Sequence, residues 1–292
     1  MAPKHQFSDL SISDTQLESE TQRERISIAS SLGYANVATP YQAATKLTVA
    51  DKCKIRKLDV EEILAATRGH PPPNQQEGDG DDTISSTKVH SSKLLQLTRL
   101  NIPIEDTNIA QEAMNSATIL NSYDILAVQP LSERAFAFAC NSLDIDIISL
   151  DLSKRLSYKF KPDLIKAALQ RGVYFEILYA PLLREPGSRR QMFANAQSLA
   201  RETRGRGIII SSGARTAIEL RGPYDVVNLA TFLGLSEAQA HAGVGKNAAA
   251  VVEHAKSRKA FRGTLVIRPF EPGSDNPLLN LEAAAPEAMK TD

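Results

Sequence analysis

Histidine is the side chain that most often performs acid–base or metal chemistry at neutral pH, and this chain has five of them. They form no HxH or HExxH motif and are spread over the whole sequence, as His5, His70, His90, His241 and His254. A metal-dependent hydrolase needs several histidines and carboxylates that converge on one cavity. The histidine spacing therefore argues against metal-dependent hydrolysis, and we expect no metal bound by this chain.

Two further groups of reactive residues also lack the context that their chemistry needs. The run Gly243-Val244-Gly245-Lys246 resembles a phosphate-binding loop, but alanine stands where its first glycine belongs and Asn247 follows the lysine in place of Ser or Thr. We predict a turn between two helices there. The serines have no GxSxG context, and Cys140 lies in an apolar helical run, so we predict no catalytic nucleophile.

Carboxylates stand at the ends of several predicted strands, where they are able to act as acids or bases. They are Asp9, Asp124, Asp151 and Glu176. Such residues more often cap a helix or hold a nearby arginine, and we expect that structural role for each of them.

Basic residues gather after three predicted strands, although the whole chain is neutral, with 34 Lys/Arg and 34 Asp/Glu. Residues 154–206 alone hold 12 Lys/Arg against four acids. Phosphate binding responds to local charge, so we predict that these cations form a surface for a polyanion, either RNA or DNA, with Tyr158 and Phe160 available to stack on bases. The candidate residues are Lys154, Arg155, Lys159, Lys161, Arg184, Arg189, Arg190, Arg215 and Arg221.

The strands and helices that position these carboxylates and cations are predicted from short β-branched runs that alternate with amphipathic segments. Strands are predicted over Phe7–Ile12, Ala35–Thr39, Leu94–Leu100, Tyr123–Val128, Ile145–Leu150, Tyr174–Tyr179 and Gly207–Ser211. Helices are predicted over Gln16–Leu32, Ser132–Ser142, Pro162–Arg171, Ser188–Thr203 and Lys246–Lys259, with a capping box at Ser236 and Gln239. Strand–helix repetition of this kind predicts a parallel sheet, and seven units favour a closed barrel over an open sheet.

Composition divides the 292 residues into one domain and two segments with little to bury. We expect residues 1–70 to form the first units of the barrel and 93–270 to form the rest with the last helices. Residues 71–92 are predicted to be a disordered insert, and the acidic residues 271–292 a disordered tail. The chain has no 18-residue apolar run, no apolar segment near its start and only two cysteines, so we expect a soluble intracellular protein.

An ordered series of short motifs resembles a known family. It begins with Tyr123-Asp124-Ile125-Leu126-Ala127-Val128 and Asp144-Ile145-Asp146-Ile147-Ile148-Ser149, and continues with Phe175-Glu176-Ile177-Leu178-Tyr179-Ala180-Pro181 and Ile208-Ile209-Ile210-Ser211-Ser212-Gly213-Ala214. It ends with Arg221-Gly222-Pro223-Tyr224-Asp225-Val226-Val227-Asn228-Leu229 and Phe232-Leu233-Gly234-Leu235-Ser236. In this order the motifs resemble the roughly thirty-kilodalton protein subunit of ribonuclease P, which eukaryotes share with RNase MRP.

This resemblance implies a distorted TIM-like barrel of the PHP type and a noncatalytic subunit of an RNA enzyme. Cleavage of precursor tRNA would belong to the RNA and its Mg²⁺ ions, and no cofactor would be bound by this chain. The implied partners are the RNase P or MRP RNA, precursor tRNA, a small RRM-like subunit and other subunits, with no membrane. The implied location is the nucleus and nucleolus, with a role in rRNA processing. Where a metal-dependent relative has an HxH pair on its first strand, this chain has Ser8-Asp9-Leu10-Ser11-Ile12, so that only Asp9 is a candidate relic.

Two alternatives remain open from the sequence. One is a PHP-type metal phosphoesterase that acts alone, and the other is a protein-only scaffold whose basic residues face acidic partners.

Overall fold

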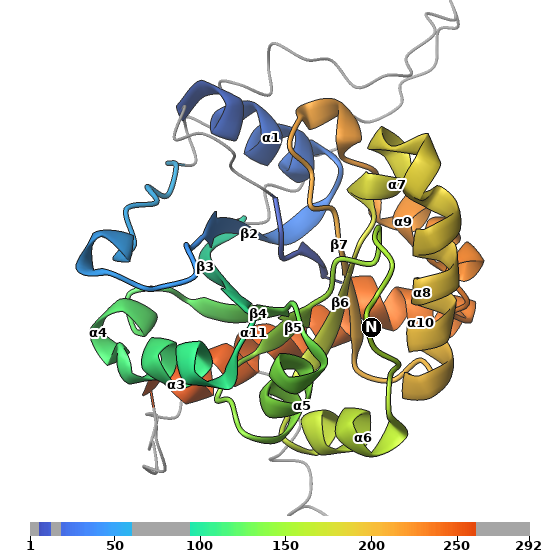
Figure 1. Ribbon diagram of the computed structural model, residues 1–292. Coiled ribbons are helices and arrows are strands. Elements are labelled where there is room, and N and C mark those ends of the chain that lie inside the picture. The colour runs from blue at the N-terminus through green and yellow to red at the C-terminus, as the bar shows by residue number, and fades with distance from the viewer. Residues whose placement is uncertain (1–5, 13–18, 60–93, 261–292) are drawn as a thin grey trace, which may run out of the picture. The chain divides into compact units, whose positions relative to one another are not determined.

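Seven strands form one parallel sheet in the computed structural model, which describes residues 6–12, 19–59 and 94–260. The strands are adjacent in the order of the chain, so that each pairs with the next one (Figure 1). They are β1 (Phe7–Asp9), β2 (Tyr34–Gln42), β3 (Leu95–Ile104), β4 (Ile125–Pro130), β5 (Ile147–Ser149), β6 (Tyr174–Leu178) and β7 (Ile208–Ser211). This arrangement confirms the parallel sheet expected from strand–helix repetition.

The first and last strands come together, so that the sheet is a nearly closed barrel. The amide N of Gly213, just after β7, donates to the carbonyl O of Ser11, just after β1, at 2.8 Å. The amide N of Ser212 donates to Oδ1 of Asp9 at 3.0 Å, and the Ser212 hydroxyl donates to the Ser11 carbonyl at 3.1 Å. Asp9 is therefore part of the seam that closes the barrel.

Helices surround the strands in Figure 1. The α-helices are α1 (Ser19–Ser31), α3 (Thr107–Asn115), α4 (Ala117–Leu120), α5 (Glu133–Asn141), α6 (Pro162–Gln170), α7 (Ala180–Arg184), α8 (Arg189–Thr203), α9 (Pro223–Phe232), α10 (Glu237–Val244) and α11 (Lys246–Ala260), and the short 3₁₀ turns are η1 (Val49–Asp51), η2 (Pro186–Ser188) and η3 (Ala217–Glu219). In α5 the Ser132 hydroxyl accepts from the amide N of Ala135, and the buried face carries Phe136 and Cys140. Cys140 is fully buried, as its place in an apolar helical run indicates.

The last helix closes the amino-terminal end of the barrel. Its apolar face, with Val251 and Val252, packs against side chains that point inward near the starts of the strands, such as Leu97, Ile125 and Ile147. In Figure 1, α11 runs behind the strands, and the opposite end of the barrel faces the reader.

The structure confirms all seven predicted strands but moves several of their ends. β2 continues through Pro40, beyond its predicted end at Thr39, and β3 continues to Ile104, beyond its predicted end at Leu100. Both extensions keep the ladder in register with the neighbouring strand. β5 begins only at Ile147, since the Asp146 carboxylate accepts the hydrogen bond from the amide N of Leu126. Four α-helices were not predicted, α3, α4, α7 and α9, whereas the capping box at Ser236 and the last helix are confirmed.

The predicted insert over residues 71–92 and the tail over 271–292 lie outside the described residues. Among the helices that the structure does describe, none is long and apolar enough to cross a membrane.

Candidate functional site

A cavity of about 280 Å³ opens at the carboxyl end of the barrel. Polar side chains from three neighbouring strands reach into it, namely Asn101 of β3, Gln129 of β4 and Ser149 of β5. Charged side chains from the segments that follow β5, β6 and β7 surround it, and they are Asp151, Lys154, Arg184, Glu185 and Arg215. Barrels usually carry their functional sites at this end, since loop residues converge there.

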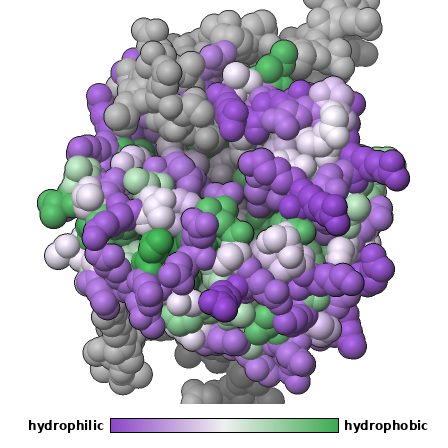
Figure 2. Space-filling model, in the orientation of Figure 1, coloured by the Kyte–Doolittle hydropathy of each residue, from purple (hydrophilic) through white to green (hydrophobic). Residues whose placement is uncertain are grey.

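The nine predicted RNA-binding residues all follow β5, β6 or β7. Lys154, Arg184 and Arg215 line the cavity. The others lie in the β5–α6 loop, at the start of α8 and in the loop before α9, and they are Arg155, Lys159, Lys161, Arg189, Arg190 and Arg221. With α11 behind the barrel, the face toward the reader in Figure 2 is mostly hydrophilic.

Five of these nine cations have partners within the chain. Lys154 pairs with Asp151 at 3.1 Å and Lys161 with Glu133 at 2.8 Å. Arg184 lies 3.6 Å from Glu219, and the remaining two donate to backbone carbonyl groups, Arg189 to that of Leu182 and Arg221 to those of Ile218 and Leu220.

The other four residues are exposed, and their side chains make no hydrogen bond or ion pair with the described residues: Arg155, Lys159, Arg190 and Arg215. Their charge is accordingly free to meet an anion.

The prediction that Tyr158 and Phe160 stack on bases is wrong. Both side chains are buried, at 8% and 7% exposure. Their rings lie 5.1 Å and 5.8 Å from the ring of Phe136, measured between centroids. Residues alternate around Lys159, so that the lysine points outward while the two aromatic rings fill the core.

An ion pair inside the barrel supports the floor of the cavity. Arg99 of β3 and Glu176 of β6 are both fully buried and form two hydrogen bonds, of 2.5 and 2.6 Å. Arg99 also donates to the carbonyl O of Leu10 and, through Nε, to Oδ1 of Asn101 at 2.7 Å. The expectation that Glu176 holds an arginine is confirmed. Arg99 itself was not predicted, although an arginine inside an apolar strand signals a need for a buried counter-charge. Its partner comes from a strand that is not its neighbour in the sheet.

Asp9 is 1% exposed and serves the seam of the barrel. Its Oδ1 accepts from the amide N of Ser11 and that of Ser212, while Oδ2 has no hydrogen-bond partner among the described residues. Burial raises the pKa of this carboxyl above its usual 3.8. Within residues 6–12, 19–59 and 94–260, no three His, Cys, Asp or Glu side chains gather in a group that could hold a metal ion.

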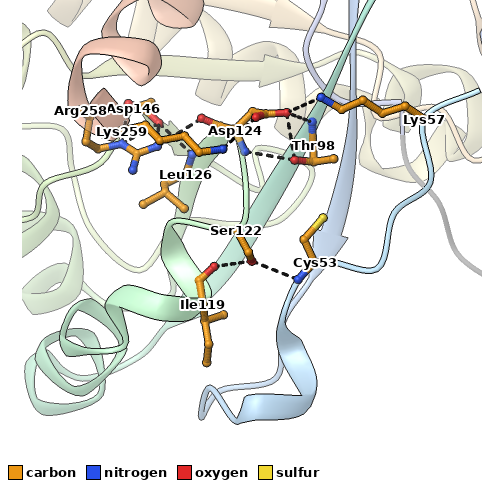
Figure 3. Close-up of polar contacts among 10 residues, drawn as sticks. All are labelled: Cys53, Lys57, Thr98, Ile119, Ser122, Asp124, Leu126, Asp146, Arg258 and Lys259. Carbon is orange, nitrogen blue, oxygen red and sulfur yellow. Dashed lines mark hydrogen bonds and ion pairs between the residues drawn. The ribbon is translucent and has the colours of Figure 1, made fainter. Parts of the chain in front are cut away.

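Two further carboxylates fasten α11 at the other end of the barrel (Figure 3). Asp124 accepts from Lys57 at 3.0 Å and from Lys259 at 3.1 Å, as well as from the amide N of Thr98. Burial alone raises the pKa of Asp124, but these hydrogen bonds outweigh it and lower the pKa to about 2. The expectation of a structural role is confirmed for Asp124.

Asp146 is the second of these carboxylates and holds two residues of α11. It accepts from Arg258 at 3.0 Å and lies 2.8 Å from Nδ1 of His254. The hydrogen bond to Asp146 raises the pKa of His254. His254 therefore fastens a helix and lies at the opposite end of the barrel from the cavity.

The predicted turn between two helices is confirmed, but within the run 243–246 it consists of Gly245 alone. Gly243 lies in α10, and Gly245 ends that helix before α11 begins at Lys246. Nδ2 of Asn247 donates to the carbonyl O of Ile208 at 2.8 Å, which ties the turn to β7.

Comparisons with known proteins agree with this geometry. The family model described as RNase P subunit p30 matches residues 6–260. Protein GAMETOPHYTE DEFECTIVE 1 of Arabidopsis thaliana is 35% identical over 233 residues, which are 80% of this chain and 39% of that protein. Ribonuclease P protein subunit p30 of Mus musculus is 35% identical over 183 residues, 63% of this chain and 68% of that protein. The chain thus spans well under half of the plant protein and about two thirds of the mouse protein.

A chain in the cryo-EM structure of archaeal ribonuclease P with mature tRNA has the same fold, with a TM-score of 0.59 and 16% identity. The match covers 89% of this chain and 95% of that one. The nearly closed sheet of seven parallel strands confirms the TIM-like barrel expected from the sequence.

Proposed function

Because this chain belongs to the family of RNase P subunit p30, we propose that it is a noncatalytic protein subunit of ribonuclease P and RNase MRP. The observation that carries the proposal is the family match, which extends over the whole described barrel. In this role the chain supports the removal of the 5′ leader from precursor tRNA and the processing of rRNA. Cleavage belongs to the RNA and its Mg²⁺, and the protein contributes positive charge and shape.

The RNA-binding surface on this proposal is the carboxyl end of the barrel. It comprises Lys154, Arg155, Lys159, Lys161, Arg184, Arg189, Arg190, Arg215 and Arg221. The four cations that have no partner among the described residues would neutralise phosphates without first giving up an ion pair, so they contribute most. Such contacts position RNA and carry no sequence information.

Protein partners complete the proposal: a small RRM-like subunit and other subunits of the particle, in the nucleus and nucleolus. Two exposed apolar side chains support contact with a protein, Ile218 of η3 at 81% exposure and Tyr224 of α9 at 63%.

The RNA-binding surface is tested by comparing two triple variants. Arg155→Ala, Arg190→Ala and Arg215→Ala remove free cations from the proposed surface. Lys166→Ala, Arg201→Ala and Arg206→Ala are the matched control, since these cations are also exposed and lie on α6, at the end of α8 and just before β7.

Binding of the cognate RNA is measured by fluorescence anisotropy from low to high KCl. We expect the first variant to reduce the slope of log K against log[KCl] by about 2–3, because each lost phosphate contact removes about 0.7–0.9. The control variant should keep the slope. Cleavage of precursor tRNA by the reconstituted particle at limiting Mg²⁺ should fall with the first variant only. The proposed function would be contradicted if both variants lost RNA binding and cleavage equally. It would also be contradicted if neither the native chain nor the control variant stimulated cleavage of precursor tRNA.

A further inference from the structure

The cavity at the carboxyl end has a composition that phosphate neutralisation alone does not explain. Exposed lysines and arginines suffice for backbone contacts, yet this cavity is lined by carboxamides and hydroxyls as well as cations. Its volume of about 280 Å³ lies near the lower end of small-molecule sites, which begin at roughly 300 Å³. It is the right scale for one small polar ligand and too small for a folded RNA element.

The floor offers hydrogen-bonding groups that the protein leaves unused. Oδ1 of Asn101 accepts from Arg99, which fixes the amide so that Nδ2 is the group left over. Neither this Nδ2 nor the carboxamide of Gln129 makes a hydrogen bond with another described residue. The buried pair of Arg99 and Glu176 holds Asn101 in place from below. A fixed amide donor beside a second carboxamide, which both donates and accepts, is suited to the edge of a nucleobase.

The rim offers unused donors for an anion. Nε and Nη1 of Arg184 are buried and make no hydrogen bond with the described residues, since Glu219 lies 3.6 Å away. Arg215 is exposed and lines the same cavity, and its side chain has no partner among those residues. Buried guanidinium nitrogens without an acceptor are costly, and a phosphate is the ligand that best satisfies them. Glu185 also lines the cavity and supplies an acceptor for a ribose hydroxyl.

We infer that this cavity binds one ribonucleotide, with its base on Asn101 and Gln129 and its phosphate on Arg184 and Arg215. The ligand is either a free mononucleotide or one unstacked nucleotide of a bound RNA, which present the same chemistry. The inference goes beyond the proposed function, and it rests on that function only if the nucleotide belongs to an RNA.

The test is a calorimetric titration of the full-length chain with 5′-UMP, 5′-AMP, uridine and inorganic phosphate. We expect at least one mononucleotide to bind about tenfold more tightly than phosphate or uridine, because only a nucleotide engages floor and rim together. Phosphate that binds as tightly as both nucleotides, or no nucleotide binding at all, overturns the inference.

Two variants probe the two halves of the site, each with a matched control. Gln129→Met and Arg184→Met should each weaken nucleotide binding about tenfold or more. Gln170→Met and Arg201→Met change the same residue types at exposed positions outside both the cavity and the proposed RNA-binding surface, and they should leave binding unchanged. Arg184→Lys keeps the charge while losing the fork of donors, and urea unfolding identifies any variant that has lost its fold. Equal weakening by the controls also overturns the inference.

Competition identifies the source of the nucleotide. If the better-binding mononucleotide displaces a fluorescein-labelled single-stranded RNA and Gln129→Met weakens both ligands, the site holds a nucleotide of the RNA. If it binds without displacing the RNA, the ligand is a free nucleotide. If the native chain binds no nucleotide but still stimulates cleavage of precursor tRNA, this inference alone is refuted. If it binds the nucleotide but does not stimulate cleavage, the proposed function alone is refuted.

Discussion

The pair of Arg99 and Glu176 gives the sharpest prediction about stability. Both side chains are 0% exposed, and the guanidinium also serves Leu10 and Asn101. Glu176→Gln keeps the shape of the side chain but leaves a buried guanidinium without its counter-charge. Breaking a buried pair in this way costs about 3–5 kcal/mol of the free energy of unfolding. With a urea m-value of about 2–3 kcal/mol/M, the unfolding midpoint should fall by about 1 to 2.5 M.

A double-mutant cycle separates the charge from the loss of packing. Arg99→Met leaves a buried carboxylate and should be as costly as Glu176→Gln. The double variant has no buried unpaired charge, so it should lose clearly less than the sum of the two. Lys256→Met is the control, because it breaks an exposed pair with Glu253 and should cost less than about 1 kcal/mol. Single variants that lose under 1 kcal/mol, or losses that simply add, would refute the reasoning.

Three further substitutions test the described contacts by urea unfolding. The raised pKa of Asp9 makes the native chain lose free energy of unfolding as pH rises above 3.8. Asp9→Asn removes this carboxyl, so the stability of the variant relative to the native chain should grow with pH and then level off. His254→Asn should remove stability that the native chain has below pH 6.5 and loses as pH rises through the raised pKa of this histidine, so the two chains should converge at alkaline pH. Gly207→Ala should cost about 1–3 kcal/mol, since φ is +62° and the new Cβ would lie 2.1 Å from a methyl of Leu169, whereas Gly187→Ala, with open space around it, should be neutral.

The sequence was sufficient to predict the strands because their signal is local. Runs such as Ile208–Ile210 are apolar on both faces, as parallel strands between a core and a layer of helices must be. Strand ends depended on neighbours instead. Pairing with β3 extends β2 beyond Pro40, and the Asp146 carboxylate shifts the start of β5 to Ile147. Neither effect can be predicted from the residues of one segment alone.

The site was predictable in its position and charge but not in its partners. Cations after β5, β6 and β7 had to lie at the carboxyl end, because parallel strands end together there. Which of them are already paired depends on contacts far along the chain, as in Arg184 with Glu219. The misassignment of Tyr158 has the same origin, since only the fold shows that Phe136 lies beneath it.

The seam at Asp9 also has a consequence for how the protein is made. Asp9 and Ser212, which close the barrel, are 203 residues apart in the chain. At about 5–20 residues per second, a ribosome takes roughly 10–40 s to synthesise that distance. During this interval β1 has no β7 beside it, and Leu10, which the finished fold buries completely, has neither the closed barrel nor α11 around it. The barrel is therefore completed only after β7 and α11 have been synthesised, and until then the nascent chain has to keep its first strand from pairing with other partners.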